Sequence, residues 1–247
     1  MSLKDEIRQA IANETEQRSE SWLQMRLGKF TGSQIYRLMA NVKRPMTEQE
    51  LANRAKGSKA TTIEDVNILS DGAITYIEEN IGEIWTGQSP HDFWSAATSW
   101  GEDNEGYARE EFEKRMGVKI LLNGHNIWKE YPNEAGGSSD GHVEGQDAII
   151  EIKCPLNSGI HVKYSRMTSP IDLPTEYYWQ MQSNMMFAEK SLCYFISYDP
   201  RVKKESARMK ILEVPAENRA QDLIRLKLKL AIEKKAEILN HLDNQAR

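Results

Sequence analysis

The sequence has few cysteines and no long apolar run. It contains no continuous stretch of about 18 apolar residues, the length that a transmembrane helix needs, and residues 1–20 are polar, without the apolar core of a signal peptide. The two cysteines, Cys154 and Cys193, are too few for a disulfide framework or a zinc cage. These absences argue against a membrane-spanning protein and against a disulfide-stabilised secreted one, so we expect a protein of a reducing cytoplasm.

The chain also lacks an excess of positive charge. Its 32 Lys and Arg residues are outnumbered by 37 Asp and Glu residues, which gives a formal net charge of −5. This balance disfavours binding of nucleic acid over the whole surface. A nuclease, however, needs only a local basic track, and carboxylates that bind metal lower the total charge. The net charge therefore does not exclude an enzyme that acts on DNA.

The composition predicts an ordinary globular fold, with 39% apolar and 28% charged residues. No repeat and no linker divides the chain, so we predict one α/β domain over residues 1–247. The periodicities predict helices first, then a mainly antiparallel sheet crossed by a helix, and then an amphipathic helix over about 215–242. The other expected helices cover 3–18, 20–27, 62–85, 94–117 and 177–190, with a further helix start at Thr31 or Ser33 and a loop around a short helix over 41–61; the expected strands cover 118–131, 138–153 and 191–200.

Residues 136–155, GGSSDGHVEGQDAIIEIKCP, predict two short strands joined by a tight turn. A two-residue turn at 145–146 sets Asp140 opposite Glu151. Because side chains alternate along a strand, Lys153 shares the face of Glu151. The other face is apolar, and we therefore expect the core on the side of Ile150.

The predicted hairpin therefore opposes like charges, which is destabilising unless something lies between them. Carboxylates in this position have Cβ atoms about 5 Å apart, a gap that suits a hard divalent cation. Lys153, about 7 Å along the strand from Glu151, would hold an attacking water or stabilise charge on a phosphate. The alternative is an exposed face whose charges are solvated. The glycine-rich approach and Pro155, which ends the strand, favour a site.

At these residues the sequence resembles the PD-(D/E)XK nuclease superfamily and, within it, the phage lambda exonuclease family of alkaline exonucleases, the YqaJ-type viral recombinases. That family reads S-P-D-G followed by a strand ending E-[LIV]-K-C-P, and here the matches are SSDG and EIKCP. The segments WLQMRLGKFTGSQI, WGEDNEGYAREEFEKRMG, YYWQMQSNMMFA and YFISYDPR match in the same order. Ser139 departs from the pattern, since the family has proline there. The resemblance covers about residues 20–205 and implies a restriction-endonuclease-like core, a central mixed sheet flanked by helices.

The resemblance implies a catalytic and metal-binding set. Asp140 and Glu151 are implied as metal ligands, joined by the backbone carbonyl of Ile152. Glu105 is implied as the carboxylate that a helix adds to the same site, although alone it would pass for a solvated helix position. Lys153 is implied as the catalytic lysine. Two Mg²⁺ ions, which Mn²⁺ is able to replace, are the implied cofactors.

Four further residues match positions around the family's reaction centre. Gln180 is implied as the glutamine on the helix behind the active site. Arg26 is implied to hold a terminal 5′-phosphate, with Ser33 and Ser138 as hydroxyls nearby. Taken alone, Gln180 would be an amide at the edge of the core, Arg26 half of a surface ion pair, and Ser33 a helix cap.

The implied activity is that of a Mg²⁺-dependent 5′-to-3′ exonuclease that digests one strand of double-stranded DNA, releases 5′-mononucleotides and leaves a 3′ tail for homologous recombination. The implied substrate is the end of a DNA duplex, and the implied partner is a single-strand annealing protein. The resemblance also implies that the chain assembles into a ring-shaped homotrimer. If the chain is phage- or prophage-encoded, the implied location is the bacterial host cytoplasm. Lys43 and Arg44 are candidate DNA contacts, with a solvated loop equally open, and we expect His142 and His161 at the surface. A restriction-type endonuclease and a non-catalytic DNA-binding module remain alternatives.

Overall fold

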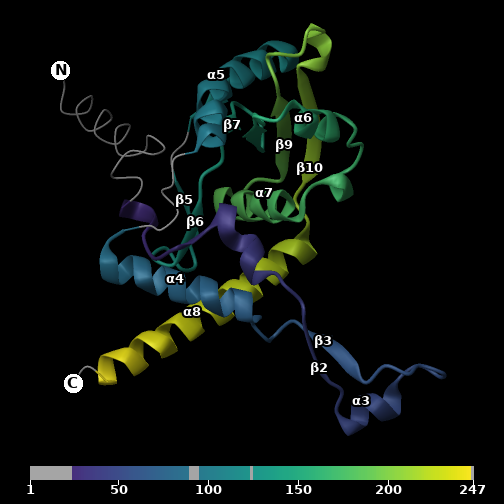
Figure 1. The fold of residues 1–247 in the computed structure, drawn as a ribbon, viewed down its shortest axis with the longest axis vertical. Coiled ribbons are helices and arrows are strands. Elements are labelled where there is room, and N and C mark those ends of the chain that lie inside the picture. The colour runs from purple at the N-terminus through teal and green to yellow at the C-terminus, as the bar shows by residue number, and fades with distance from the viewer. Residues whose placement is uncertain (1–23, 89–94, 123–124, 246–247) are drawn as a thin grey trace.

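The computed structural model describes residues 24–88, 95–122 and 125–245 (Figure 1). The expected helix over 3–18 and the first part of that over 20–27 lie outside these ranges. Within the described ranges, no helix is long and apolar enough to cross a membrane. The single domain over 1–247 stays a prediction.

A five-stranded sheet forms the centre of the molecule. Its strand order is β10-β9-β8-β7-β4, in which β8 and β9 run parallel and the other neighbours run antiparallel. The strands are β4 (Ile120–Leu121), β7 (Gly141–Val143), β8 (Ala148–Lys153), β9 (Leu192–Tyr198) and β10 (Met209–Pro215). The predicted central sheet, mixed and mainly antiparallel, is therefore confirmed.

Helices cover both faces of this sheet (Figure 1). They are α5 (Ala96–Met116) on one face, and α6 (Ser158–Ser165) and α7 (Thr175–Ala188) on the other. Phe112 of α5 packs with Ile150, and Met181 of α7 packs with Ile149. The core expected on the side of Ile150 is present, and a second core lies on the other face, because the parallel pairing of β8 with β9 requires a crossover that lays α7 over that face. Glu151 on that face is only 1% exposed.

The register of β7 against β8 is as predicted. Gly141 lies opposite Ile150, and the backbone N–H of Asp140 donates to the carbonyl of Ile150 at 3.1 Å. Continuing this register by one residue sets Asp140 opposite Glu151.

The turn that closes this hairpin is displaced by one residue from the prediction. The N–H of Gln146 donates to the carbonyl of Val143 at 3.1 Å, so Glu144 and Gly145 are the central residues. Gly145 has φ of 72°, and a left-handed conformation favours glycine at this second central position. The N–H of Glu144 instead donates to Lys119, which ties the turn to the segment before β4.

A small three-stranded sheet, in the order β1-β6-β5, lies beside the central one. Its strands are β1 (Phe30–Thr31), β5 (Asn126–Ile127) and β6 (Ala135–Gly137), with β1 parallel to β6. After β1 the chain forms a 3₁₀ helix, η1 (Gly32–Leu38), with Thr31 as its N-cap residue. The predicted helix start at this point is thus correct in place, and the helix is of the tighter kind.

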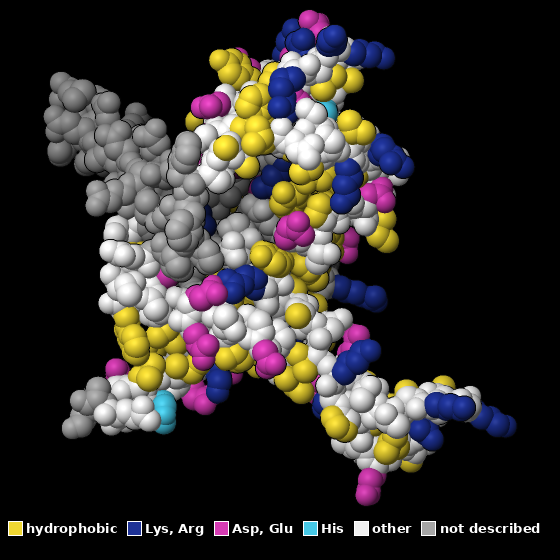
Figure 2. Space-filling view, in the orientation of Figure 1, with side chains coloured by type: hydrophobic (Ala, Val, Ile, Leu, Met, Phe, Trp, Pro, Cys, Tyr) yellow, Lys and Arg dark blue, Asp and Glu magenta, His cyan; other side chains and the backbone are white. Residues whose placement is uncertain are grey.

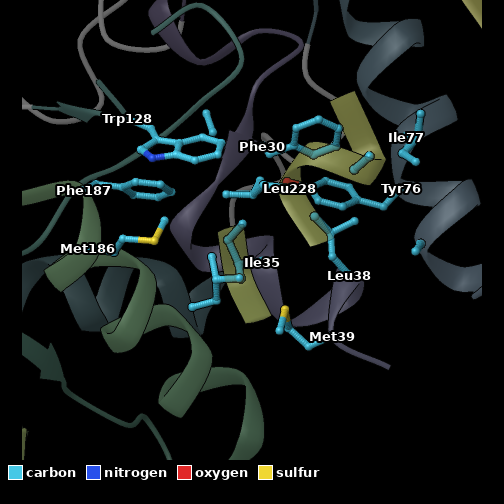
Figure 3. Close-up of a cluster of buried hydrophobic side chains, with 14 of the residues drawn as sticks. Phe30, Ile35, Leu38, Met39, Tyr76, Ile77, Trp128, Met186, Phe187 and Leu228 are labelled. Atoms are coloured by element: carbon cyan, nitrogen blue, oxygen red, sulfur yellow. The ribbon is translucent and has the colours of Figure 1, made fainter. Parts of the chain in front are cut away.

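Two long helices hold this region. They are α4 (Asp71–Thr86) and α8 (Asn218–Gln245). Figure 3 shows Phe30, Ile35 and Leu38 gathered with Tyr76 of α4 and Leu228 of α8 in one buried cluster. The predicted helix over 62–85 starts late, because the Ser70 side chain caps it by accepting from the N–H of Ala73. The C-terminal helix expected over about 215–242 is present as α8.

Residues 41–66 form an arm that projects from the body (Figure 1). The arm consists of β2 (Val42–Pro45), α3 (Glu48–Asn53) and β3 (Thr62–Asp65), and β2 pairs with β3 antiparallel. The predicted loop around a short helix is therefore correct for the helix but misses the hairpin around it. Two further 3₁₀ turns, η2 (Pro170–Asp172) and η3 (Glu205–Ala207), complete the described elements.

Candidate active site

A cavity of about 790 Å³ lies where the end of β8 meets α5, α7 and the start of η1. Figure 2 shows this face of the molecule hollowed at its centre. Nine residues that the sequence picked out line the cavity together: Arg26, Ser33, Glu105, Ser138, Asp140, Glu151, Ile152, Lys153 and Gln180. Lys43 and Arg44 lie on the projecting arm and do not line it. The fold therefore gathers residues spread over most of the chain into one hollow.

Glu151 is the most buried charged group of the cavity. Its Oε1 accepts from Lys153 Nζ and from Gln180 Nε2, both at 2.7 Å, and its Oε2 accepts from Asn184 Nδ2 at 3.3 Å. Burial raises the pKa of Glu151 to about 7; Lys153 opposes this shift, and the negative charge of Asp140 adds to it. Burial makes the ionised form of Glu151 unfavourable in free energy, and a nearby positive charge would offset this cost.

Asp140 reaches from the start of β7 across to β8. Its Oδ2 accepts from the backbone N–H of Ile152 at 2.6 Å. This contact fixes the carboxylate beside the strand that carries Glu151 and Lys153, on the wall of the same cavity.

Lys153 is the last residue of β8, and its ammonium group points into a cluster of partners. Besides Glu151, it contacts Oε1 of Gln180 at 3.5 Å and lies 4.7 Å from the ring centroid of Tyr177. Burial works to lower the pKa of Lys153, but Glu151 and Asp140 outweigh it and raise the pKa above its ordinary value. Lys153 therefore keeps its positive charge within the site.

The oxygen donors of the cavity suit a hard divalent cation. Asp140, Glu151 and the chain at Ile152 offer carboxylate and carbonyl oxygens, the ligands that Mg²⁺ prefers. The carboxylate of Glu105 lines the same cavity from α5 and pairs with Arg109 at 2.7 Å. Within the described residues, no group of three or more His, Cys, Asp or Glu side chains is arranged to hold a metal ion. The fit of the cavity to a divalent cation therefore rests on the side chains of Asp140 and Glu151 and on the backbone at Ile152, with Glu105 nearby.

Arg26 also lines the cavity, and its Nη2 lies 3.5 Å from Oγ of Ser33, which is the outer limit of a hydrogen bond. The segment that carries it is anchored at Gly28. The N–H of Gly28 donates to Glu83, and its carbonyl accepts from Lys235, both at 2.9 Å. Gly28 has φ of 68°, and a Cβ there would lie 2.3 Å from a side-chain carbon of Ile84. Only glycine fits, so the position of Arg26 is set by packing against α4 and α8.

Residues 21–191 match the profile of the YqaJ-like viral recombinase domain. The chain belongs to this family. No curated protein matches the sequence. The predicted kinship with YqaJ-type, lambda exonuclease-like proteins is confirmed.

Solved structures share the fold of this YqaJ-like protein. An alkaline exonuclease from Laribacter hongkongensis, LHK-Exo, has a TM-score of 0.71 at 23% identity, over 92% of this chain and 98% of its own. The same protein in complex with dAMP has a TM-score of 0.72 over the same shares. A phage-related exonuclease from Haemophilus somnus has a TM-score of 0.67 at 14% identity, over 87% and 96%. These likenesses confirm the predicted fold class.

Two residues that contact the lining of this cavity were not predicted from the sequence. Asn184 contacts Glu151 and also donates to the carbonyl of Ser138 at 3.3 Å. It lies four residues after Gln180, and this spacing places both side chains on the same face of the helix, so the sequence contained a signal for Asn184. His125 approaches Oγ of Ser138 at 3.4 Å, and burial together with nearby Arg26 lowers its pKa to about 4. Its loop carries no periodic signal.

Arg201, in the YFISYDPR segment, fixes the chain just after Lys153. Its Nη2 donates to the carbonyl of Leu156 at 2.9 Å, and its Nε donates to Asp199, also at 2.9 Å. The guanidinium lies 4.3 Å from the ring centroid of Trp100 on α5. Because Leu156 lines the cavity, these contacts set one of its walls.

The expected surface position of His161 is wrong. The side chain is 2% exposed, and its ring nitrogens contact Oγ of Ser197 at 2.8 Å and the carbonyl of Ala207 at 3.0 Å. His161 lies on α6, which packs on β9 and β10, so the ring fills that interface instead of the surface.

Proposed function

We propose that this YqaJ-like protein is a divalent-metal-dependent exonuclease that digests one strand of double-stranded DNA in the 5′-to-3′ direction and releases 5′-mononucleotides. One observation carries the proposal: the cavity that holds Asp140, Glu151 and Lys153 also holds Arg26 and Ser33. A hydrolytic set and an anion-binding arginine in the same hollow suit a substrate that ends in a phosphate. Relatives of the same fold that are alkaline exonucleases support the nuclease class.

Asp140, Glu151 and the carbonyl of Ile152 are the groups that would hold Mg²⁺, or Mn²⁺ in its place, and Glu105 is the neighbour for a second ion. A metal held there would supply an activated water and would neutralise charge on the leaving oxygen.

The chain's own residues supply orientation and charge. The ammonium of Lys153 stabilises negative charge that develops on the phosphate, or holds the attacking water. Gln180 donates to Glu151 and contacts Lys153, so one amide fixes both partners. Asn184 holds the second oxygen of Glu151. These contacts leave the carboxylate with one orientation toward the cavity.

Arg26 gives the site its preference for an end. Its planar guanidinium is able to bind two oxygens of a terminal 5′-phosphate, and the hydroxyls of Ser33 and Ser138 line the same cavity. A phosphate inside a continuous strand carries a nucleotide on each side, so it cannot offer Arg26 the same free oxygens as a terminal 5′-phosphate. This arrangement favours digestion from an end over cleavage within a duplex.

The product of such digestion is a 3′ single-stranded tail, which an annealing protein would take up in homologous recombination. The viral recombinase family supports this role. We further propose a homotrimeric ring, in which closed symmetry repeats the basic groups around a central channel. The mass of the protein in solution tests the ring.

The function is tested with linear 5′-phosphorylated duplex DNA and a covalently closed circle, each incubated with protein and Mg²⁺. We expect the linear duplex to release mononucleotides from its 5′ ends and to leave single-stranded DNA, while the circle survives. Discrete fragments from the circle would instead identify a restriction-type endonuclease. DNA binding without hydrolysis of either substrate would identify a non-catalytic module.

A further inference from the structure

In the arm, residues 41–66, the side chains of Glu50, Glu64 and Asp65 are held by hydrogen bonds within the arm. Arg44 donates from Nε to Asp65 at 2.7 Å and from Nη1 and Nη2 to Glu50 at 2.8 Å. Glu50 also forms a capping box with Thr47, and Asn41 donates to Glu64 at 2.9 Å. The guanidinium of Arg44 thus joins β2, α3 and β3, and a DNA contact by Lys43 or Arg44 stays a prediction. These hydrogen bonds hold the two strands and the helix of the arm together.

The end of the arm has the opposite character. Residues 51–61, LANRAKGSKAT, are here named the arm tip and contain Arg54, Lys56 and Lys59 but no Asp or Glu. All three cations are exposed, and within the described part of the chain none forms an ion pair with a carboxylate. Arg54 donates to the carbonyl of Ala60 at 3.3 Å, a contact that leaves its charge without a carboxylate partner in the described ranges. A chain of net charge −5 thus presents three cations without a carboxylate partner among the described residues on a projecting arm, where Figure 2 shows exposed Lys and Arg side chains.

The backbone of the arm tip is accessible to a ligand. Gly57 turns it with φ of 86°, and a Cβ there would meet nothing within 4 Å. The residues between the cations are small: Ala55, Gly57 and Ser58. The arm tip carries no exposed large apolar side chain, whereas the centre of a protein–protein interface is apolar and poor in lysine. Lysine and arginine on a small-residue backbone suit phosphates instead.

We infer that the arm tip is a second DNA contact, which binds the phosphate backbone of duplex DNA outside the cavity through Arg54, Lys56 and Lys59. The inference rests on the proposed function, since the duplex bound there is the one whose end occupies the cavity. The arm, held in shape by its internal hydrogen bonds, is a second attachment point that keeps the duplex bound to the protein between cleavage steps. The contact is electrostatic and carries no sequence preference.

The test compares the wild-type protein with the triple variant Arg54→Gln, Lys56→Gln, Lys59→Gln. The control variant, Lys114→Gln, Lys203→Gln, Lys204→Gln, removes the same charge near the β9–β10 connection, far from the arm (Figure 1). Binding to a long duplex with 5′-hydroxyl ends is measured in EDTA over a range of salt, which separates the arm from both Arg26 and metal.

We expect the arm-tip variant to bind DNA more weakly than the wild type. The slope of log K, where K is the association constant for DNA, against log salt concentration should fall in magnitude by about 2 to 3, because each phosphate contact contributes about 0.9 to this slope. The control variant keeps the wild-type slope. Equal slopes for the arm-tip variant and the wild type would overturn the inference. A fall in assembly mass for the arm-tip variant, with unchanged DNA binding, would also overturn it and make the arm tip an interface between copies.

The proposed exonuclease function and the proposed DNA contact of the arm tip are tested by independent experiments. Digestion of 5′-phosphorylated linear duplex by the wild-type protein tests the proposed function and does not depend on the arm variants. A further variant, Lys56→Arg with Lys59→Arg, keeps the charge and is expected to retain wild-type DNA binding, which separates charge loss from damage to the fold.

Discussion

Gln180 donates from its Nε2 to Oε1 of Glu151 at 2.7 Å, and this contact helps to join helix α7 to strand β8 at the wall of the candidate active site. The acceptor is a carboxylate that is 1% exposed. A buried charge needs hydrogen-bond donors, and Gln180, Asn184 and Lys153 supply them. The residue behind the site is thus tied directly to a group proposed to hold metal.

Replacing Gln180 with alanine is expected to lower both stability and activity. Loss of a hydrogen bond to a buried charge costs about 1.5–3 kcal/mol, and loss of a group that orients a metal ligand costs about 10- to 100-fold in rate. Thermal unfolding and the initial rate on linear duplex measure the two effects.

Gln182 on the same helix provides the control. It is buried as well, but it donates to the carbonyl of Pro215 and accepts from the N–H of Glu217, away from the cavity. Gln182→Ala is expected to lose stability and keep its rate. Equal loss of rate in the two variants would show that α7 acts only as a structural support.

Lys153→Ala is expected to reduce the hydrolysis rate by about 10²- to 10³-fold, the effect of removing one charge-stabilising donor. Binding of duplex DNA should change little, since one ammonium among several cations is lost. Lys190, which pairs with exposed Asp147 at 3.6 Å, is the matched control, and Lys190→Ala should keep full activity. An unchanged rate for Lys153→Ala would remove this residue from the mechanism.

The stability of the protein in EDTA is expected to depend on pH through Glu151. Burial raises the pKa of this carboxyl from 4.5 to about 7, so the folded protein holds the proton to a higher pH than the unfolded chain does. Its contribution is complete below about pH 4.5 and is lost as the pH rises through about 7. Glu151→Gln mimics the protonated form, so its melting temperature should rise relative to the wild type across this window.

Asp199 serves as the pH control because its shift has the opposite sign. Burial works to raise the pKa of Asp199, but hydrogen bonds from Arg201 and Ser158 hold it at about 2. Its contribution is present above pH 3.8 and is lost only as the pH falls through about 2. The offset between Asp199→Asn and wild type should therefore stay constant from pH 4.5 to 7. A constant offset for Glu151→Gln as well would contradict the assignment.

Arg26→Ala is expected to abolish the preference for 5′-phosphorylated over 5′-hydroxyl ends, with a loss of about tenfold or more on the phosphorylated substrate. Arg37, on η1, is the control: it forms a two-point ion pair with Glu79 and stacks on Tyr76, so its role is in the fold. Arg37→Ala should lower the melting temperature and keep the preference. If Arg26→Ala also kept it, the phosphate would have to bind elsewhere.

Local pairing rules were sufficient for the centre of the site. The sequence predicted Asp140 opposite Glu151, and the register of β7 with β8 agrees, because strand alternation depends only on neighbours in the chain. The turn was misplaced by one residue, since the N–H of Glu144 bonds to Lys119, which is distant in sequence.

Contacts between distant segments could not be read from such rules. The parallel pairing of Phe30 with Ala135 brings the Arg26 segment beside the site, and no local pattern marks it. Burial of Glu151 follows from α7 crossing the sheet, which depends on the β8–β9 topology. The position of Arg26 near the cavity came from the family resemblance, and its anchoring by Lys235 joins segments over 200 residues apart.

The most direct test of the proposed end-directed hydrolysis uses a linear, 5′-phosphorylated duplex labelled at the 5′ end of one strand in one sample and at the 3′ end in another. With Mg²⁺, the account predicts that the 5′ label appears at once as a mononucleotide, while the 3′ label stays in long single-stranded DNA, and that Lys153→Ala releases neither. Early release of the 3′ label as a mononucleotide, or of the 5′ label only in long fragments, would contradict it.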